Sequence, residues 1–248
     1  MTEWFEQWFG EEYHALYPHR DEEDARRAVE LIRGVATWDR EDWILDLACG
    51  PGRHAAELGG LGAGRVVGYD LSRAMLRRAR ERTHGKVNLV RGDMRALPFR
   101  HATFALAVNL FTSFGYFLSD DEHSRVVHQV AAALAPGGYF VLDYLNAEQV
   151  RRTLRASEQA GRGRGAAERR TEVRVTRRIG EDGRFVIKEI ELRDEGRRFQ
   201  ERVRLFRPDE LATMLTEAGL QVLARFGDYD GAPPTPDSPR VILIAVRS

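Results

Sequence analysis

Short apolar runs recur along the first 145 residues of the chain, and polar or glycine-rich segments separate them. The runs lie at residues 43–47, 65–69, 87–90, 104–108 and 138–144. The segments between them with the composition and spacing of helices are residues 53–61, 72–82 and 119–134. Strands and helices that alternate in this way are typical of a parallel sheet with helices packed on both faces.

The pattern changes after residue 145, where a helix is expected over 146–158 and the glycines of 161–165 predict a flexible link. Three strand-like runs follow, separated by hairpin turns, at residues 172–179, 184–193 and 197–206. Their alternation of apolar and polar positions predicts an antiparallel sheet with one covered face.

The rest of the chain returns to the first pattern, with a helix expected over 208–218 and strands over 220–226 and 240–246. The chain as a whole therefore predicts an α/β fold. We expect a Rossmann-like, doubly wound, seven-stranded and mainly parallel sheet, with a small antiparallel β-sheet inserted after the fifth strand.

The N-terminal 34 residues carry aromatic side chains at roughly helical spacing. They are Trp4, Phe5, Trp8, Phe9, Tyr13 and Tyr17. The acidic run 21–24 then opens a helix that extends to about residue 33. We expect a helix pair that closes one edge of the core with its aromatic residues.

The first apolar run ends in a glycine loop, Asp46-x-Ala48-x-Gly50-x-Gly52. A strand, a tight turn and a helix in this order form a nucleotide cradle, because glycines expose bare backbone and the first helical amides point at the ligand. The spacing fits both a dinucleotide fingerprint and an acidic glycine loop. Asp46 favours the second, since a carboxylate facing two phosphates is repelled whereas one facing a cation is not.

Three further strands also end in polar groups. Asp70, followed by Leu71, comes eighteen residues after Gly52, the spacing at which an acid reaches a ribose diol. The third run leads into Gly92-Asp93-Met94, and the fourth ends at Asn109-Leu110. Because parallel strands share one carboxyl edge, these groups predict a ligand site there.

With these four motifs in order, residues 44–117 resemble the cofactor-binding core of class I S-adenosyl-L-methionine (SAM) methyltransferases of the small-molecule type. The family pattern has glycine where this chain has Ala48, a small substitution that leaves room for the loop. The resemblance implies SAM as cofactor and S-adenosyl-L-homocysteine (SAH) as product.

The resemblance also implies a role for the motif residues. Asp46 would face the SAM ammonium group, Asp70 the ribose hydroxyls and Asp93 the adenine amino group. The implied cofactor-binding set is Asp46, Ala48, Gly50, Gly52, Asp70, Leu71, Gly92, Asp93, Met94, Asn109 and Leu110, joined from the N-terminal segment by Tyr17 and Arg20.

Methyl transfer from a sulfonium needs no catalytic triad, because the donor is already activated and positioning can supply the catalysis. The base stays open, with Tyr13, Tyr116 and His123 as candidates. Tyr13, Tyr17 and Arg20 either line the site as a lid or only pack against the core. For His123 and His128, an exposed or half-packed position on the 119–134 helix is favoured over catalysis.

Composition narrows the possible partners. Lys+Arg and Asp+Glu both number 38, so the net charge of zero argues against a general binder of nucleic acid or membranes. Residues 151–207 nevertheless hold eighteen basic and ten acidic residues. This excess of positive charge could pair with the acidic N-terminal segment in a homodimer, could steer an anionic acceptor, or could mean only that one face of the sheet is exposed to solvent.

The chain has a single cysteine, Cys49, which excludes an internal disulfide and a cysteine-based metal site. The N-terminus is acidic and aromatic, unlike a signal peptide, and no apolar window reaches eighteen residues. We therefore expect a cytoplasmic protein without a membrane segment or a metal.

We expect four parts: an N-terminal helical lid (1–34), a SAM-binding core (35–150), an inserted β subdomain (151–207) and the end of the core (208–248). The leading hypothesis is SAM-dependent O- or N-methylation of a small molecule. The acceptor is expected between the 111–117 loop, the inserted sheet and the 227–236 loop. The alternatives are an RNA methyltransferase that uses the basic insertion and a non-catalytic SAM-binding protein. Lack of Asn-Pro-Pro-Tyr after the fourth strand argues against methylation of base amino groups.

Overall fold

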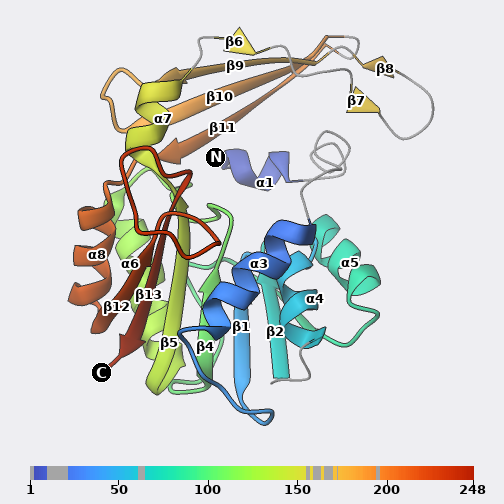
Figure 1. The fold of residues 1–248 in the computed structure, drawn as a ribbon. Helices are drawn as coiled ribbons and strands as arrows, with labels where there is room; N and C mark the ends of the chain where they lie inside the picture. The colour runs from blue at the N-terminus through green and yellow to red at the C-terminus, as the bar shows by residue number, and fades with distance from the viewer. Residues whose placement is uncertain are drawn as a thin grey trace.

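The computed structural model describes residues 3–9, 22–60, 65–154, 157–158, 163–164, 170–171, 173–193 and 196–248. Its main sheet has seven strands in the order β12-β13-β5-β4-β1-β2-β3 (Figure 1). These are β1 (Trp43–Leu47), β2 (Arg65–Asp70), β3 (Asn88–Arg91), β4 (Phe104–Asn109), β5 (Leu134–Leu145), β12 (Leu220–Phe226) and β13 (Arg240–Arg247). Strands β1 to β5 pair in parallel, and β13 pairs antiparallel with both of its neighbours, β5 and β12. The predicted doubly wound sheet is confirmed.

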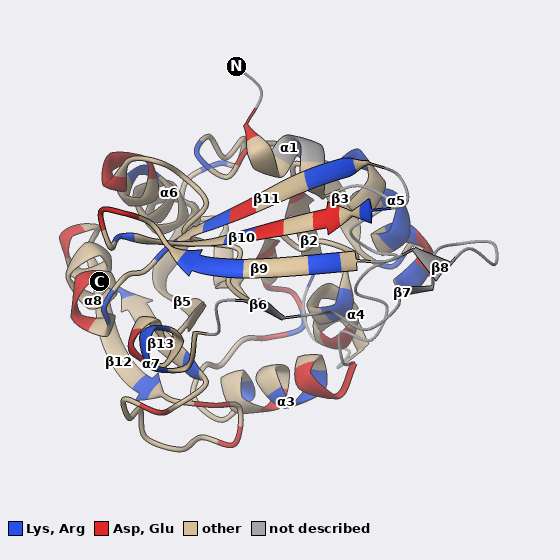
Figure 2. Cartoon of the chain, turned by 90° about the horizontal axis from the view of Figure 1, so that it is seen from above, with Lys and Arg blue, Asp and Glu red and all other residues tan. Residues whose placement is uncertain are grey.

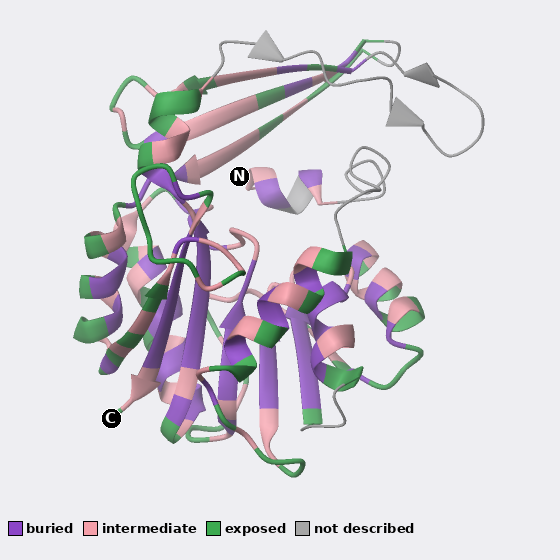
Figure 3. Ribbon diagram, viewed as in Figure 1, coloured by how far each residue is buried: buried purple, intermediate pink, exposed green. Residues whose placement is uncertain are grey.

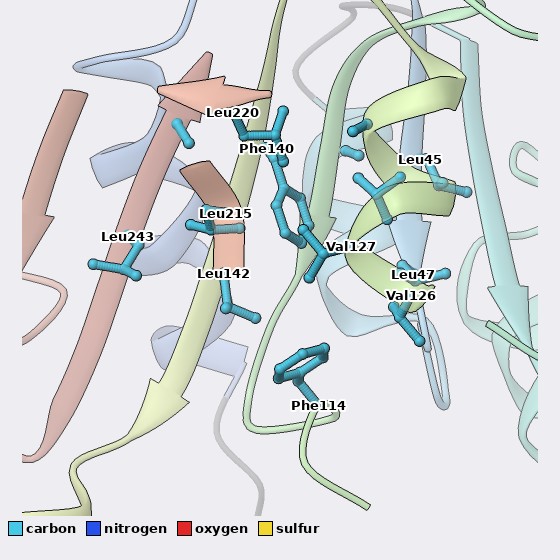
Figure 4. Packing of buried hydrophobic residues seen from close by; sticks show 14 of the residues in the cluster. Leu45, Leu47, Phe114, Val126, Val127, Phe140, Leu142, Leu215, Leu220 and Leu243 are labelled. Atoms are coloured by element: carbon cyan, nitrogen blue, oxygen red, sulfur yellow. The ribbon is translucent and has the colours of Figure 1, made fainter. Parts of the chain in front are cut away.

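Helices cover both faces of this sheet because its strands are apolar on both sides. Helices α3 (Glu22–Arg33) and α4 (Arg53–Gly60) pack on one face, and α6 (Asp120–Ala133) and α8 (Pro208–Glu217) pack on the other. Helix α5 (Arg73–Arg82) packs beside β2 and β3. Figure 4 shows the α6 and α8 side, where Leu45, Val127 and Phe140 belong to one cluster. The central strands are almost entirely buried (Figure 3).

The inserted sheet lies across the carboxyl edge of the main sheet (Figure 1). Its order is β11-β10-β9-β6, with β6 (Ser157–Glu158), β9 (Val173–Ile179), β10 (Phe185–Leu192) and β11 (Arg197–Arg204). All of its pairings are antiparallel, as predicted. A separate pair joins β7 (Gly163–Arg164) to β8 (Arg170–Thr171). Helix α1 (Trp4–Trp8) lies between the inserted sheet and the core (Figure 1).

Two predicted boundaries were wrong. Helix α7 (Ala147–Thr153) begins after the cap Asn146 but stops at Thr153, and residues 157–158 pair with β9 instead of continuing the helix. Within the expected link 161–165, residues 163–164 form β7, and the others lie outside the described residues.

Strand β5 begins directly at the end of α6, where Leu134 already has an extended backbone. The strand, expected over 138–144, therefore begins four residues earlier than predicted. A Cβ on Gly138 would come within 2.9 Å of the Phe104 carbonyl oxygen. Only glycine therefore fits at this position, where β5 passes close to β4. Within the described ranges, no helix is long and apolar enough to cross a membrane.

Candidate functional site

A cavity of about 560 Å³ opens among the segments that follow β1, β2, β3 and β4. This is the edge at which an open parallel sheet binds ligands. Its lining residues come from 48–54, 69–75, 91–94 and 110–117, together with two aromatic residues of the N-terminal segment. The predicted residues that line it are Ala48, Gly50, Asp70, Leu71, Gly92, Asp93, Met94, Leu110 and Tyr116.

The loop after β1 exposes backbone to this cavity. Gly50 has a φ of +54°, and a Cβ there would meet nothing within 4 Å. Ala48 also has a positive φ, 58°, which explains the glycine of the family pattern, because a left-handed backbone strains any residue with a Cβ. A Cβ on Gly52 would come within 2.9 Å of the Ala79 Cβ, so Gly52 lets α4 and α5 pack closely and does not line the cavity.

Asp70 ties the tip of β2 to this loop. Its carboxylate accepts hydrogen bonds from the backbone N–H groups of Gly50, at 2.8 Å, and Ser72, at 2.7 Å. Burial raises the pKa of Asp70, and these two donors partly offset that effect. The arrangement fixes one acid on the cavity wall beside the bare loop backbone.

Asp46 and Asn109 lie behind the wall and are not among the lining residues. Asp46 is 1% exposed, and its Oδ2 has no hydrogen-bond partner among the described residues. Burial, with the nearby charge of Asp70, raises the pKa of Asp46 to about 7. The Asn109 side-chain amide donates to the Leu47 carbonyl at 3.0 Å and joins the ends of β1 and β4.

Asp93 is held by a neighbouring guanidinium. Arg95 pairs with Asp93 at 2.6 Å, and it also pairs with Glu3 and Glu122 at 2.6 Å each. Partial burial alone would raise the pKa of Asp93, but the hydrogen bonds from Arg95 outweigh it and hold that pKa below its ordinary value. Asp93 therefore lines the cavity as a carboxylate whose oxygens are bound by Arg95.

The loop after β4 holds two consecutive residues with a left-handed backbone. Phe111 and Thr112 have φ values of 62° and 60°, and neither is glycine. The Phe111 N–H donates to the buried Asp143 at 2.8 Å. The Phe111 ring lies beneath two guanidinium groups, with Arg53 4.9 Å and Arg240 5.1 Å from its centroid. Paired strain and a buried anchor mark this loop as a functional wall.

Arg53 and His54 also line the cavity, and sequence reasoning missed both. His54 is 6% exposed, and burial together with the charges of Arg53 and Arg240 lowers the pKa of His54 to about 3. The imidazole is therefore neutral at physiological pH and can accept a hydrogen bond. Their position, directly after the second glycine of the loop, was the signal available in the sequence.

The N-terminal segment contributes Phe5 and Phe9 to the lining. The Phe9 ring stacks on that of Tyr116 at 5.6 Å, so the candidate Tyr116 faces an aromatic cover. The predicted site residues Tyr13, Tyr17 and Arg20 lie outside the described residues.

The structure does not bring His123 into the cavity. It is fully buried, at 0% exposed, among the rings of Phe114, Phe117 and Phe206. The prediction of an exposed or half-packed side chain was wrong for His123, because the face of α6 that bears it is covered by the 114–117 loop. Burial lowers the pKa of His123 to about 4. The other histidine of this helix, His128, is exposed.

The cavity differs from the expected acceptor site. Of the three segments expected to enclose an acceptor, only the 111–117 loop supplies lining residues in the part of the chain that the structure describes. Nor do the described residues include a group of three or more His, Cys, Asp or Glu side chains placed to hold a metal ion.

Known proteins that are similar to this chain are methyltransferases. Residues 44–138 match the family described as methyltransferase domain. A dTDP-4-amino-2,3,4,6-tetradeoxy-D-glucose N,N-dimethyltransferase from Saccharopolyspora spinosa is 32% identical over 132 residues, which are 53% of this chain and 52% of that protein. The match thus spans about half the length of this curated relative.

Two solved structures share the fold across nearly the whole chain. The CcbJ methyltransferase from Streptomyces caelestis has a TM-score of 0.76 and 23% identity, covering 97% of this chain and 98% of that one. SAM-bound CalS10, an amino pentose methyltransferase from Micromonospora echinaspora, has a TM-score of 0.64 and 24% identity, covering 96% of this chain and 95% of that one. At these identities the likeness shows the fold.

Proposed function

We propose that this chain is a class I SAM-dependent methyltransferase and transfers a methyl group from SAM to a small-molecule acceptor. The observation that carries the proposal is the cavity at the carboxyl edge of the sheet. There, Asp70 and Asp93 follow β2 and β3 and stand beside the bare backbone at Gly50.

The residues present fit SAM. A cavity of about 560 Å³ lies within the roughly 300–1,000 Å³ of small-molecule sites. Asp70 would accept from the ribose hydroxyls and Asp93 from the adenine amino group, with Leu71 and Met94 against the ring. The methionine end would lie along Ala48 and Gly50. Bound SAM supplies a methyl group that its sulfonium already activates, and SAH is left as product.

Three predicted residues contribute indirectly in this proposal. Asp46 supplies negative charge from behind the loop, and its partnerless Oδ2 suits a nearby ammonium group. Gly52 and Asn109 hold the loop and strand ends that carry the lining residues. The contributions of Tyr17 and Arg20 to SAM binding, and of Tyr13 to catalysis, stay predictions.

The chain's own residues would orient the acceptor and exclude water. Phe5, Phe9, Phe111 and Tyr116 give the cavity aromatic walls. His54 is the neutral group that we assign to accept a hydrogen bond from the acceptor nucleophile. The positive charge of Arg53 beside it disfavours a second cation, so an amine held there releases its proton more readily.

We infer O- or N-methylation, and amines on sugar-like molecules are the first acceptors to test. The named curated relative and the SAM-bound neighbour both act on amino sugars by their descriptions. We also propose that the protein is cytoplasmic, that it forms a homodimer and that the chain is divided into the four parts given above.

Calorimetry with SAH, followed by SAH release from SAM over a panel of amino sugars, nucleotide-linked amino sugars and hydroxylated metabolites, tests the function. The expected result is SAH binding and turnover of at least one amine or hydroxyl acceptor. Absence of SAH binding would refute the methyltransferase proposal. Binding without turnover of any acceptor would favour the non-catalytic SAM-binding protein.

A further inference from the structure

The inserted sheet packs on α1 and also contacts the wall of the cavity at Met75, while the Arg204 N–H donates to the Gly115 carbonyl oxygen in the loop after β4. Its inner face packs on Trp8, which is 1% exposed and whose ring lies 4.4 Å from that of Phe199 on β11. The apolar residues that complete this cluster are Met75, Val173, Val175, Ile190 and Leu192. No described residue of the insertion lines the cavity. The sheet is therefore a support for α1 (Figure 1).

A polar contact lies inside this apolar packing. The Trp8 Nε1–H donates to Glu201 Oε1 at 2.6 Å, and Lys188 Nζ lies 3.2 Å from Glu201 Oε2. Lys188 and Glu201 are cross-strand partners on β10 and β11, with side chains 13% and 16% exposed. A carboxylate buried to this degree needs a counter-charge and hydrogen-bond donors, and Lys188 and the Trp8 N–H supply them.

The opposite side of α1 faces the cavity. Phe5 and Phe9 line it, and the Ser72 hydroxyl donates to the Phe9 carbonyl oxygen at 2.6 Å. The Trp4 Nε1–H donates to the Tyr116 carbonyl oxygen at 3.3 Å. Helix α1 thus touches the loops after β2 and β4 below and the inserted sheet above.

Tertiary contacts alone can keep α1 in place. A helix of five residues is too short to be stable in isolation, since nucleation costs more than one turn of hydrogen bonds returns. Trp8 lies one turn from Trp4 and next to Phe9, so the contacts of Trp8 with the inserted sheet act on the same short helix that carries Phe5 and is followed by Phe9.

We propose that Glu201 and Lys188 are positioning residues of the donor site, which hold α1 over the cavity by way of Trp8. The inference rests on the proposed function in one respect, that the cavity holds SAM. It assigns the insertion a task distinct from acceptor contact and from dimerisation: it fixes the aromatic cover of the cofactor.

Three variants and one control test this. Trp8→Phe removes the N–H but keeps a ring against Phe199, Glu201→Leu removes the acceptor, and Glu201→Gln keeps a carbonyl acceptor for Trp8. The control is Glu189→Gln, which breaks an ion pair with Arg178 in which both side chains are about half exposed. Hydrogen exchange of residues 4–8 is measured without ligand, and the SAH dissociation rate by stopped flow.

We expect Trp8→Phe and Glu201→Leu to exchange faster over residues 4–8 and to release SAH about tenfold faster, the effect of one charged hydrogen bond. Glu201→Gln should recover most of the wild-type rate, and Glu189→Gln should match the wild type. Thermal unfolding of ligand-free Trp8→Phe should change little, which separates positioning from a general loss of stability.

Wild-type exchange over residues 4–8 in folded Trp8→Phe would overturn the proposal. So would equal rates of SAH release in Glu201→Gln and Glu201→Leu. If Glu201→Leu fails to fold, Trp8→Phe and Glu201→Gln decide the matter. Failure of SAH to bind the wild-type protein would count against the methyltransferase proposal. Hydrogen exchange measured without ligand would still test whether Trp8 and Glu201 hold α1 in place.

Discussion

The backbone N–H of Phe111 donates a 2.8 Å hydrogen bond to the fully buried carboxylate of Asp143 at the end of β5. The same carboxylate accepts from the Tyr229 hydroxyl at 2.6 Å and pairs with Arg240. The Thr112 N–H donates to the Asp143 carbonyl oxygen at 3.1 Å. One residue thus anchors the two consecutive left-handed positions of the loop after β4 and joins the 227–236 loop to it through Tyr229.

Asp143→Asn should destabilise the fold by on the order of 3 kcal/mol, because it leaves the Arg240 guanidinium without its buried counter-charge. Tyr229→Phe removes a single hydroxyl donor and should cost about 1 kcal/mol. Urea denaturation followed by circular dichroism measures both. Equal losses in the two variants would show that the charge of Asp143 does not anchor the loop.

Asp70→Ala should weaken SAH binding about tenfold to a hundredfold, since it removes a charged acceptor from the cavity wall. The loss of its bonds to Gly50 and Ser72 should also lower the free energy of unfolding by about 1–3 kcal/mol. Calorimetry on the folded variant measures the affinity. Asp237→Ala, at a carboxylate 79% exposed, is the control and should bind as the wild type does. Unchanged affinity in Asp70→Ala would refute the ribose assignment.

Asp46 predicts a pH dependence of stability. Its pKa rises from 3.8 to about 7 on folding, so the folded state keeps a proton that the unfolded chain has already released between these values. Stability from this group is full below pH 3.8 and falls as the pH rises towards 7. Asp46→Asn should therefore be more stable than the wild type at pH 8, by on the order of 3 kcal/mol, with no difference near pH 4. Equal stabilities at pH 8 would show that the Asp46 carboxylate is well solvated.

The fold and half of the site were predictable because they depend on local pattern. Apolar runs fix the strands, and the residue after each run, such as Asp70 or Asp93, lies at the carboxyl edge by topology alone. Contacts between distant segments leave no such mark. Asp143 and Arg240 are 97 residues apart, and Trp8 and Glu201 are 193 apart. The left-handed backbone at Phe111 could not be predicted, because no glycine occupies that position. Helix α7 ends earlier than predicted because residues 157–158 pair with β9.

We expect the basic insertion to bind RNA only weakly, because ion pairs within the protein neutralise part of its positive charge. Strand β9 carries only basic charges, whereas acidic and basic residues are mixed on β10 and β11 (Figure 2). Arg198 pairs with Glu191 at 3.0 Å, and Arg204 with Asp120 at 3.1 Å. Filter binding of bulk tRNA at low and moderate salt should therefore give weak association. Tight association that falls steeply with salt, accompanied by methyl incorporation, would favour the RNA methyltransferase instead.

The two buried histidines offer a matched pair for the last prediction. His54 and His123 are both nearly inaccessible and both have lowered pKa values, but only His54 lines the cavity. His54→Ala should lower kcat by about tenfold or more with the best acceptor of the panel, because it removes the acceptor of the nucleophile's hydrogen bond. SAH affinity should change less than threefold, about 0.7 kcal/mol, since the cofactor assignments lie elsewhere. His123→Ala should lose stability and keep kcat.

The pH profile separates this role from that of an ordinary base. Because burial and the charges of Arg53 and Arg240 hold the pKa of His54 near 3, its imidazole stays neutral from pH 5 to 8. The rate should therefore show no inflection near pH 6.5 that disappears in His54→Ala, and any inflection should belong to the acceptor or to Asp46, whose pKa is about 7. Initial rates of SAH release for both proteins over this range measure it. A wild-type inflection near pH 6.5 that His54→Ala abolishes would make His54 a titrating base, and an unchanged kcat in His54→Ala would remove it from the reaction.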